Sequence, residues 1–132
     1  MAMQRPKMLI SDDDFDLRES LGAVFSARGL ETRFAGDGRE AFEIVCNENI
    51  HLVLIDFHMP RMTGLEALRL IKDYRQELPV ILMSAEIDDA MTRDIEAADA
   101  FSVHRKPVNI QQIRDDVAAA LKSIYDWPAN CQ

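Results

Sequence analysis

The sequence has few of the residues that would crosslink, kink or anchor a chain. Its 132 residues include two cysteines, five prolines, five glycines and one tryptophan. Cys46 and Cys131 have no metal-type spacing, so we expect neither a disulfide framework nor a thiolate metal site. No apolar run approaches the roughly 20 residues of a membrane helix, and residues 1–7 lack the apolar core of a signal peptide. These absences predict a cytoplasmic protein without a membrane span.

Basic residues are also scarce. Fifteen lysines and arginines stand against 23 aspartates and glutamates, which gives a formal net charge of −8. Because contacts with phosphate backbones need basic residues, we expect no direct nucleic-acid binding by this domain. Hydrophobic residues make up 48% and charged residues 29%, which is typical of a globular domain able to bury a full core.

Short apolar runs alternate along the chain with longer segments of helical periodicity. This alternation predicts five strand–helix units with parallel crossovers, and therefore a doubly wound α/β fold with helices on both faces of a five-stranded parallel sheet. The expected strands are residues 8–10, 31–35, 52–55, 80–83 and 100–103. No linker divides the chain. We expect one domain over residues 1–125, followed by a C-terminal tail or the start of a linker over 126–132.

Several helix ends carry their own sequence signals. Asp37 is expected to cap the second helix, Thr63 and Glu66 fit a capping box at the third, and Asn109 is expected to cap the last. The last helix shows one apolar side, made of Ile110, Ile113, Val117, Leu121 and Ile124.

Polar residues follow four of the expected strands. Asp12 and Asp13 follow the first, Asp56 the third and Ser84 the fourth, and Lys106 lies just past the fifth. Because the carboxyl ends of parallel strands open on one edge of a sheet, these side chains can converge there. Taken singly, each has a simpler interpretation as a helix cap, a turn residue or a solvated lysine. Their joint placement at four strand ends favours a site.

The residue types at these strand ends suit phosphoryl transfer. Three neighbouring carboxylates repel unless a divalent cation holds them, and oxygen ligands suit Mg²⁺. A lysine would offset negative charge on a phosphoryl group, and a serine hydroxyl would donate to one of its oxygens. Asp56, when ionised, would then have a free lone pair to attack phosphorus.

At these residues the chain resembles the receiver domain of two-component response regulators, the chemotaxis-regulator-like superfamily. The resemblance covers about residues 7–125. Its motifs are the acidic pair, an Asp-x-x-Met-Pro-x-Met-x-Gly stretch, a Ser-Ala pair and a Lys-Pro pair, found here at Asp12-Asp13, 56–64, Ser84-Ala85 and Lys106-Pro107. It implies the flavodoxin-like strand order 2-1-3-4-5.

The resemblance also implies a phosphorelay function. Asp56 would accept a phosphoryl group from a sensor histidine kinase or a histidine phosphotransfer protein, with Ser84 and Lys106 binding that group. Mg²⁺, with Mn²⁺ as an alternative, would be held by Asp12, Asp13, Asp56 and the backbone carbonyl of His58. The protein would be a switch that phosphorylates and dephosphorylates itself rather than a turnover enzyme. Its output partner is not identified, and a phosphorylation-dependent dimer is left open.

One position departs from the family pattern. Receivers usually carry Tyr or Phe three residues before the lysine, where the ring moves as the Ser or Thr follows the phosphoryl group. Val103 occupies that position here, and Phe101 lies two residues earlier. The resemblance therefore supports phosphorylation more strongly than the aromatic version of the switch. Lys106–Pro107 is expected to be a cis peptide bond, as is usual in the family.

Three alternative functions fit the sequence less well. An aspartate-nucleophile phosphatase of the haloacid dehalogenase type would need a second Asp two residues after its nucleophile, where this chain has His58. A flavodoxin-like cofactor binder would need Gly, Ser or Thr after the first strand, where three aspartates stand. A phosphate-independent, receiver-like interaction module would require loss of Asp56, Asp13 or Lys106, and all three are present.

Overall fold

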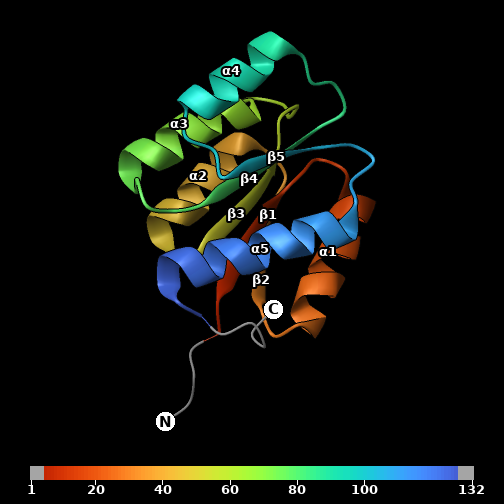
Figure 1. The fold of residues 1–132 in the computed structure, drawn as a ribbon, viewed down its shortest axis with the longest axis vertical. Coiled ribbons are helices and arrows are strands. Elements are labelled where there is room, and N and C mark those ends of the chain that lie inside the picture. Colours follow the sequence, from red (N-terminus) through yellow and green to blue (C-terminus); the bar gives the residue numbers. More distant parts are fainter. Residues whose placement is uncertain (1–4, 128–132) are drawn as a thin grey trace.

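The computed structural model describes residues 5–127. Five strands alternate with five helices along the chain (Figure 1): β1 Lys7–Ser11, α1 Phe15–Ala27, β2 Glu31–Ala35, α2 Gly38–Asn47, β3 Leu52–Asp56, α3 Gly64–Tyr74, β4 Val80–Ser84, α4 Asp89–Ala97, β5 Ser102–Arg105 and α5 Ile110–Tyr125. Residues 128–132 of the expected tail, with Cys131, lie outside the described residues. Within the described residues, no helix is long and apolar enough to cross a lipid bilayer.

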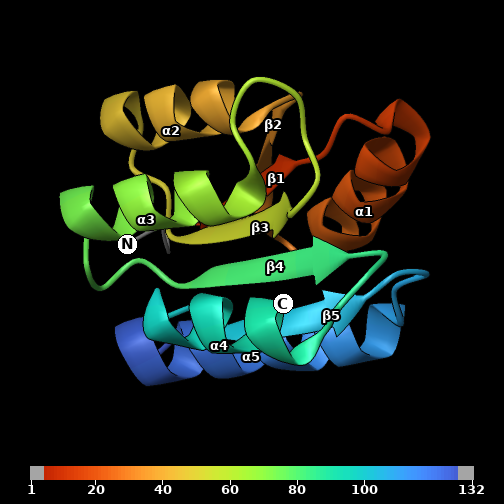
Figure 2. The ribbon, with the colours of Figure 1, turned by 90° about the horizontal axis from the view of Figure 1, so that it is seen from above.

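All neighbouring strands are parallel, and their order is β2-β1-β3-β4-β5. The arrowheads in Figure 2 point the same way, so the loops that follow the strands open on one edge of the sheet. β3 and β4 are buried at every position, as expected for central strands covered on both faces. The predicted doubly wound fold and its strand order are confirmed.

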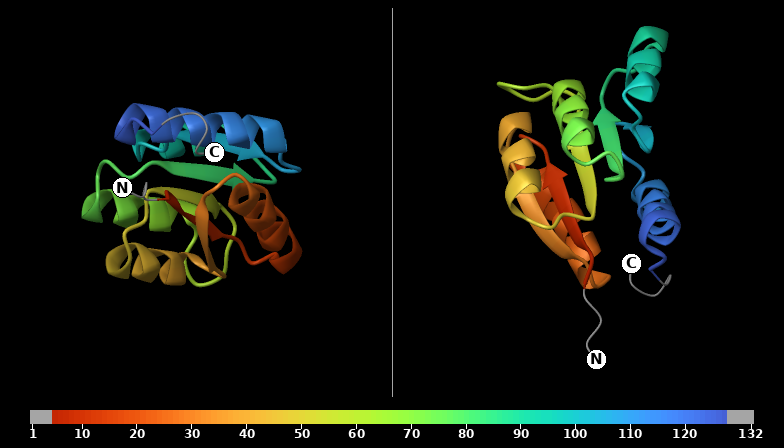
Figure 3. Two further views of the ribbon diagram at one scale, coloured as in Figure 1. Left: turned by 90° about the horizontal axis from the view of Figure 1, so that it is seen from below. Right: turned by 90° about the vertical axis from the view of Figure 1, so that its left-hand side faces the viewer.

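The core is divided by the sheet into two layers. On one face, α2, α3 and α4 cover alternate residues of the central strands, including Val53, Ile55 and Leu82. On the other face, α1 and α5 cover the intervening residues, including Leu54 and Met83. Figures 1 and 3 show the strands enclosed between these two groups of helices. Successive residues of the central strands β1, β3 and β4 thus pack alternately into the two layers of the core.

The predicted caps are present. Asp37 accepts a hydrogen bond from the Glu40 N–H at 2.8 Å and begins α2. Thr63 and Glu66 form the reciprocal capping box of α3. Asn109 accepts a hydrogen bond from the Gln112 N–H and begins α5.

One prediction near the C-terminal end was wrong. β5 spans Ser102–Arg105 rather than residues 100–103, because a half-buried edge strand does not require a continuous apolar run. Phe101 consequently lies before the strand, with 38% of its surface exposed. Ile124, on the apolar side of α5, is also 38% exposed, whereas Ala120 and Leu121 are buried.

A buried histidine joins three elements at the end of the sheet opposite the acidic strand ends. His51 precedes β3, and its Nδ1 accepts a hydrogen bond from the Lys7 N–H at 2.9 Å. The rings of Tyr125 and Trp127 meet the imidazole edge to face, with centroids 5.3 and 4.7 Å away. Burial, reinforced by the charges of Arg75 and Lys7, lowers the pKa of His51 below its ordinary value. The folded protein therefore favours the neutral ring, whose Nδ1 can accept.

This histidine should make stability depend on pH. A lowered folded pKa means that the unfolded chain binds the extra proton first, so the contribution of His51 is complete above its unfolded pKa of about 6.5 and is lost as pH falls below it. We expect the free energy of unfolding to fall more between about pH 7 and about pH 5 in the wild type than in His51→Asn, measured by chemical denaturation. Asn keeps an acceptor near the Lys7 N–H but does not titrate. Equal pH dependence in the two proteins would contradict this assignment.

Candidate functional site

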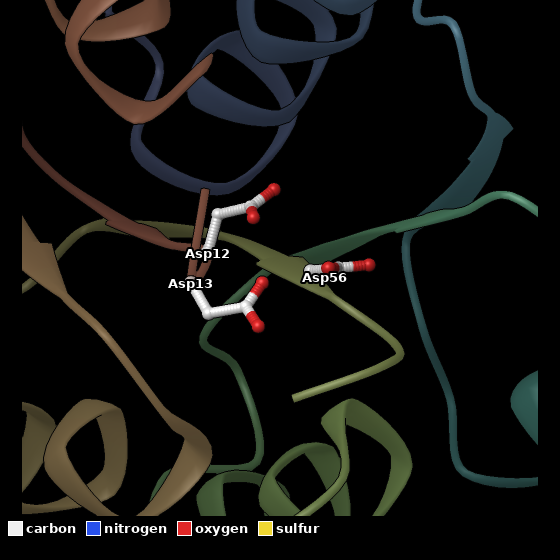
Figure 4. A group of neighbouring side chains, drawn as sticks. All are labelled: Asp12, Asp13 and Asp56. Carbon is white, nitrogen blue, oxygen red and sulfur yellow. The ribbon is translucent and has the colours of Figure 1, made fainter. Parts of the chain in front are cut away.

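Three aspartates meet at the edge of the sheet where the strands end. Asp12 and Asp13 follow β1, and Asp56 is the last residue of β3. One carboxylate oxygen from each lies within 4.8 Å of the other two. Asp12 and Asp56 are buried, whereas Asp13 is exposed. Figure 4 shows the three side chains extending from the two neighbouring strand ends into a common space.

Asp12 is held rigidly by its neighbours. Its N–H donates to the Ala35 carbonyl at 3.1 Å, which continues the β1–β2 pairing past the end of the strand. Its Oδ1 accepts a hydrogen bond from the Asp14 N–H at 2.8 Å. Asp14 in turn caps α1 by accepting from the Leu17 N–H. Asp14 therefore caps α1, whereas Asp12 and Asp13 belong to the acidic cluster.

Lys106 supplies the countercharge. Its Nζ lies 2.9 Å from Asp12 Oδ2 and 3.2 Å from Asp56 Oδ2. Its backbone N–H donates to the Ser84 carbonyl, which fixes the segment after β5 against the end of β4. Burial alone would lower the pKa of Lys106, but its hydrogen bond to Asp12 and the negative charges of Asp56 and Asp12 raise it. Lys106 therefore carries a positive charge in the folded protein. The following peptide bond, Lys106–Pro107, is cis, as expected.

The pKa of Asp56 is raised above its ordinary value, because burial and a neighbouring negative charge outweigh the groups that lower it. Burial raises the pKa of Asp56, and the negative charge of Asp12 raises it further. Lys106 and the His58 N–H, which donates to Asp56 Oδ1 at 3.3 Å, act in the other direction. The site holds three carboxylates and one ammonium, so an additional cation would relieve its excess negative charge.

Ser84 lies at the end of β4 and is fully buried. Its hydroxyl donates to the Glu86 carbonyl at 2.6 Å and accepts from the Glu86 N–H at 3.3 Å. The hydroxyl is thus bound to its own loop in this structure, and not to the acidic cluster. The sequence placed the residue at the strand end but carried no information on its rotamer.

Sequence reasoning missed Arg18. Its Nη1 donates to the Asp12 carbonyl at 3.2 Å, and its guanidinium lies over the rings of Phe15 and Phe34. A signal for it existed, because Arg18 lies one helical turn past the Asp14 cap and so returns to the strand end. Arg18 thus contacts the backbone of Asp12 from the first turn of α1.

The donor set of the acidic cluster suits a hard divalent cation. All of its side-chain ligands are carboxylate oxygens, which Mg²⁺ and Mn²⁺ prefer, and none is the thiolate or imidazole typical of zinc sites. The cluster can therefore hold a metal ion of this class. A nucleophilic carboxylate beside a metal site and a lysine is an arrangement suited to phosphoryl transfer.

Comparison with known proteins agrees with this fold and site. A family model for the response regulator receiver domain matches residues 8–118. The chain is 36% identical over 115 residues to sporulation initiation phosphotransferase F of Bacillus subtilis (strain 168), covering 87% of this chain and 93% of that protein. It is 31% identical to the regulatory protein AtoC of Escherichia coli (strain K12), covering 88% of this chain but only 25% of that protein.

A solved structure shows the same architecture. The Francisella response regulator 1452 receiver domain superimposes with a TM-score of 0.84 at 26% identity, covering 90% of this chain and 98% of that one. The chain belongs to the response regulator receiver domain family, whose members act in two-component phosphorelay signalling. The matched region makes up 25% of the longer AtoC chain.

Asp13 offers a direct test of the metal site. Asp13→Asn removes one of three like charges, so the metal-free variant should be at least as stable as the wild type. Its stabilisation by saturating Mg²⁺ should fall by about 1.4 kcal/mol or more, the equivalent of a tenfold loss of affinity. Thermal unfolding with EDTA and with MgCl₂ measures both effects. Asp14→Asn, which keeps the α1 cap and lies outside the cluster, should behave as the wild type; unchanged Mg²⁺ stabilisation in Asp13→Asn would remove that residue from the site.

Proposed function

We propose that this chain is a Mg²⁺-dependent phosphoryl acceptor in a phosphorelay, with Asp56 as the residue modified. The observation that carries this proposal is the convergence of three carboxylates and Lys106 at one sheet edge. A sensor histidine kinase or a histidine phosphotransfer protein would present the phosphoryl group as a phosphohistidine. On this proposal the chain is a switch rather than a turnover enzyme, and its domain extends over residues 1–125.

The side chains have separable parts in the transfer. A lone pair of an Asp56 carboxylate oxygen forms the new bond to phosphorus while the bond to the donor imidazole nitrogen breaks, and the released imidazole takes up a proton from water. Lys106 stabilises negative charge on the transferred oxygens. Asp12, Asp13, Asp56 and the His58 carbonyl would hold Mg²⁺, or Mn²⁺ in its place, which when bound neutralises the remaining charge on the phosphoryl group.

The hydroxyl of Ser84 provides the conformational step. A hydroxyl has one proton to donate, and in this structure it is given to the Glu86 carbonyl. Donation to a phosphoryl oxygen on Asp56 would require Ser84 to release that carbonyl, so the β4–α4 loop would change its hydrogen bonding. Arg105 donates to the Ile87 carbonyl in the same loop, at 3.2 Å, which connects this change to β5.

The small side chain at position 103 shapes how that change travels. Val103 is half-buried and packs on the α4 side of the sheet, so no aromatic ring is available to swing inward there. We infer that the signal passes through the β4–α4 loop and α4. That helix is weakly anchored, since Ile95 is its one buried residue. A shift of α4 exposes a changed surface to an output partner or to a second copy of the chain.

Acetyl phosphate tests the acceptor directly. Incubation with acetyl phosphate and MgCl₂ should add one phosphoryl group to the wild type, seen by intact mass and removed by mild base. Asp56→Asn should take up none, because an amide lacks the nucleophilic oxygen. Asp73→Asn, a matched change on α3, should be modified as the wild type is. An adduct that persists in Asp56→Asn, or none in the wild type, would refute the proposal.

Loss of the Ser84 hydroxyl should uncouple the loop from the phosphoryl group. In the wild type, phosphorylation should speed hydrogen exchange of the Glu86 amide, whose acceptor is Ser84 Oγ. In Ser84→Ala this amide should exchange fast both before and after phosphorylation. Ser84→Thr, which keeps the hydroxyl, should retain the change. An unchanged Glu86 exchange rate on phosphorylation of the wild type would contradict the proposal that the Ser84 hydroxyl leaves the Glu86 carbonyl to donate to the phosphoryl group.

A further inference from the structure

The loop between β3 and α3, residues 57–63, contains a strained residue. Arg61 has φ = 67°, in the left-handed region that branched and bulky side chains seldom adopt. Its Nη1 lies 2.6 Å from Oδ2 of Asp37, which is 24 residues earlier in the chain. The Asp37 carboxylate is mostly buried, whereas the arginine is largely exposed. A backbone conformation of this kind persists where surrounding contacts enforce it.

Two more contacts hold the same loop against the same neighbours. A Cβ added to Gly38, the first residue of α2, would lie 2.6 Å from the Met62 carbonyl, so α2 and the loop approach closely there. The Sδ of Met59 lies 3.3 Å from the Ser11 hydroxyl, which is also 3.3 Å from the Asp37 carbonyl. The loop is therefore fastened to the first turn of α2 and to the end of β1.

The other side of the loop is fastened to the phosphoacceptor strand. The Gly64 N–H donates to the Phe57 carbonyl at 2.8 Å, and any side chain at Gly64 would overlap the Asp56 backbone. His58, between these two anchors, presents its backbone to the acidic cluster, since its N–H reaches Asp56 Oδ1. The position of the His58 carbonyl is consequently set by how the loop is held.

We propose that the Arg61–Asp37 ion pair is a strap that presets the β3–α3 loop for the divalent cation. By holding Arg61 in its left-handed conformation, the pair fixes where the His58 carbonyl lies relative to Asp56. Arg61 and Asp37 are positioning residues, since neither belongs to the acidic cluster. This inference rests on the proposed function, because it assumes that the cluster binds a metal. Groups that orient a ligand in this way typically change metal affinity by ~10–100-fold when they are removed.

The test separates the strap from the other tasks of the two residues. Asp37 also caps α2, so Asp37→Ser is used, which keeps a capping oxygen but loses the charge. Arg61→Asn loses the guanidinium, but Asn tolerates a positive φ. Asn is chosen instead of Gly, because a glycine would by itself make the backbone more flexible. Arg61→Lys keeps a cation and serves as the conservative variant. Arg39→Ala removes a different exposed ion pair, Arg39–Glu43, from the same helix and is the control.

Mn²⁺ is the probe, and free Mn²⁺ is counted by its electron paramagnetic resonance signal. We expect Arg61→Asn and Asp37→Ser each to raise the Kd for Mn²⁺ about tenfold, with Arg61→Lys in between. The double variant should be no weaker than either single one, because both remove the same interaction. The Tm of metal-free Arg61→Asn should stay close to that of the wild type, and Arg39→Ala should bind Mn²⁺ normally.

The outcomes distinguish the two levels of the proposal. If the wild type binds Mn²⁺ and Arg61→Asn binds it equally well, the strap is refuted and the acceptor function stands. Additive losses in the double variant would also refute it, since the residues would then act separately. If the wild type binds no Mn²⁺ and takes no phosphoryl group from acetyl phosphate, the proposed function fails first.

Discussion

One ammonium shared between two buried carboxylates is the interaction on which the rest of the site depends. The carboxylates of Asp12 and Asp56 are buried and repel each other. Lys106 Nζ lies within 3.2 Å of an oxygen of each. Burial of like charges is tolerated only where each is paired or hydrogen-bonded. The parallel sheet satisfies this condition by bringing the ends of β1 and β3, and the segment after β5, to a single edge. The fold and the charge balance therefore support each other.

Much of this arrangement was predictable because it follows from local rules. Central parallel strands appear as continuous apolar runs, so β1, β3 and β4 were located within one residue of their observed ends. Capping residues act within one helical turn, so Asp37 and Thr63 could be assigned from spacing alone. The position of the polar residues directly after the strands then predicted that Asp12, Asp13 and Asp56 lie close together.

The features that escaped prediction depend on contacts between distant segments. The rotamer of Ser84 depends on a hydrogen bond to a carbonyl two residues later. β5 has few apolar residues because it lies at the edge of the sheet. Arg18 and the Arg61–Asp37 pair become visible only when α1, α2 and the β3–α3 loop are placed around the cluster. Side chains that support a site are harder to find in sequence than those that form it, since their residue types have many other uses.

The contact between Lys106 and Asp12 joins residues 94 positions apart in the chain. The contact requires the segment after β5, the last strand along the chain, to lie beside the end of β1. A chain that is still being synthesised, or one that has been cut before β5, contains Asp56 but not the lysine that pairs with it. On the proposed function, such a chain would present Asp56 without Lys106 and would not be expected to take up a phosphoryl group.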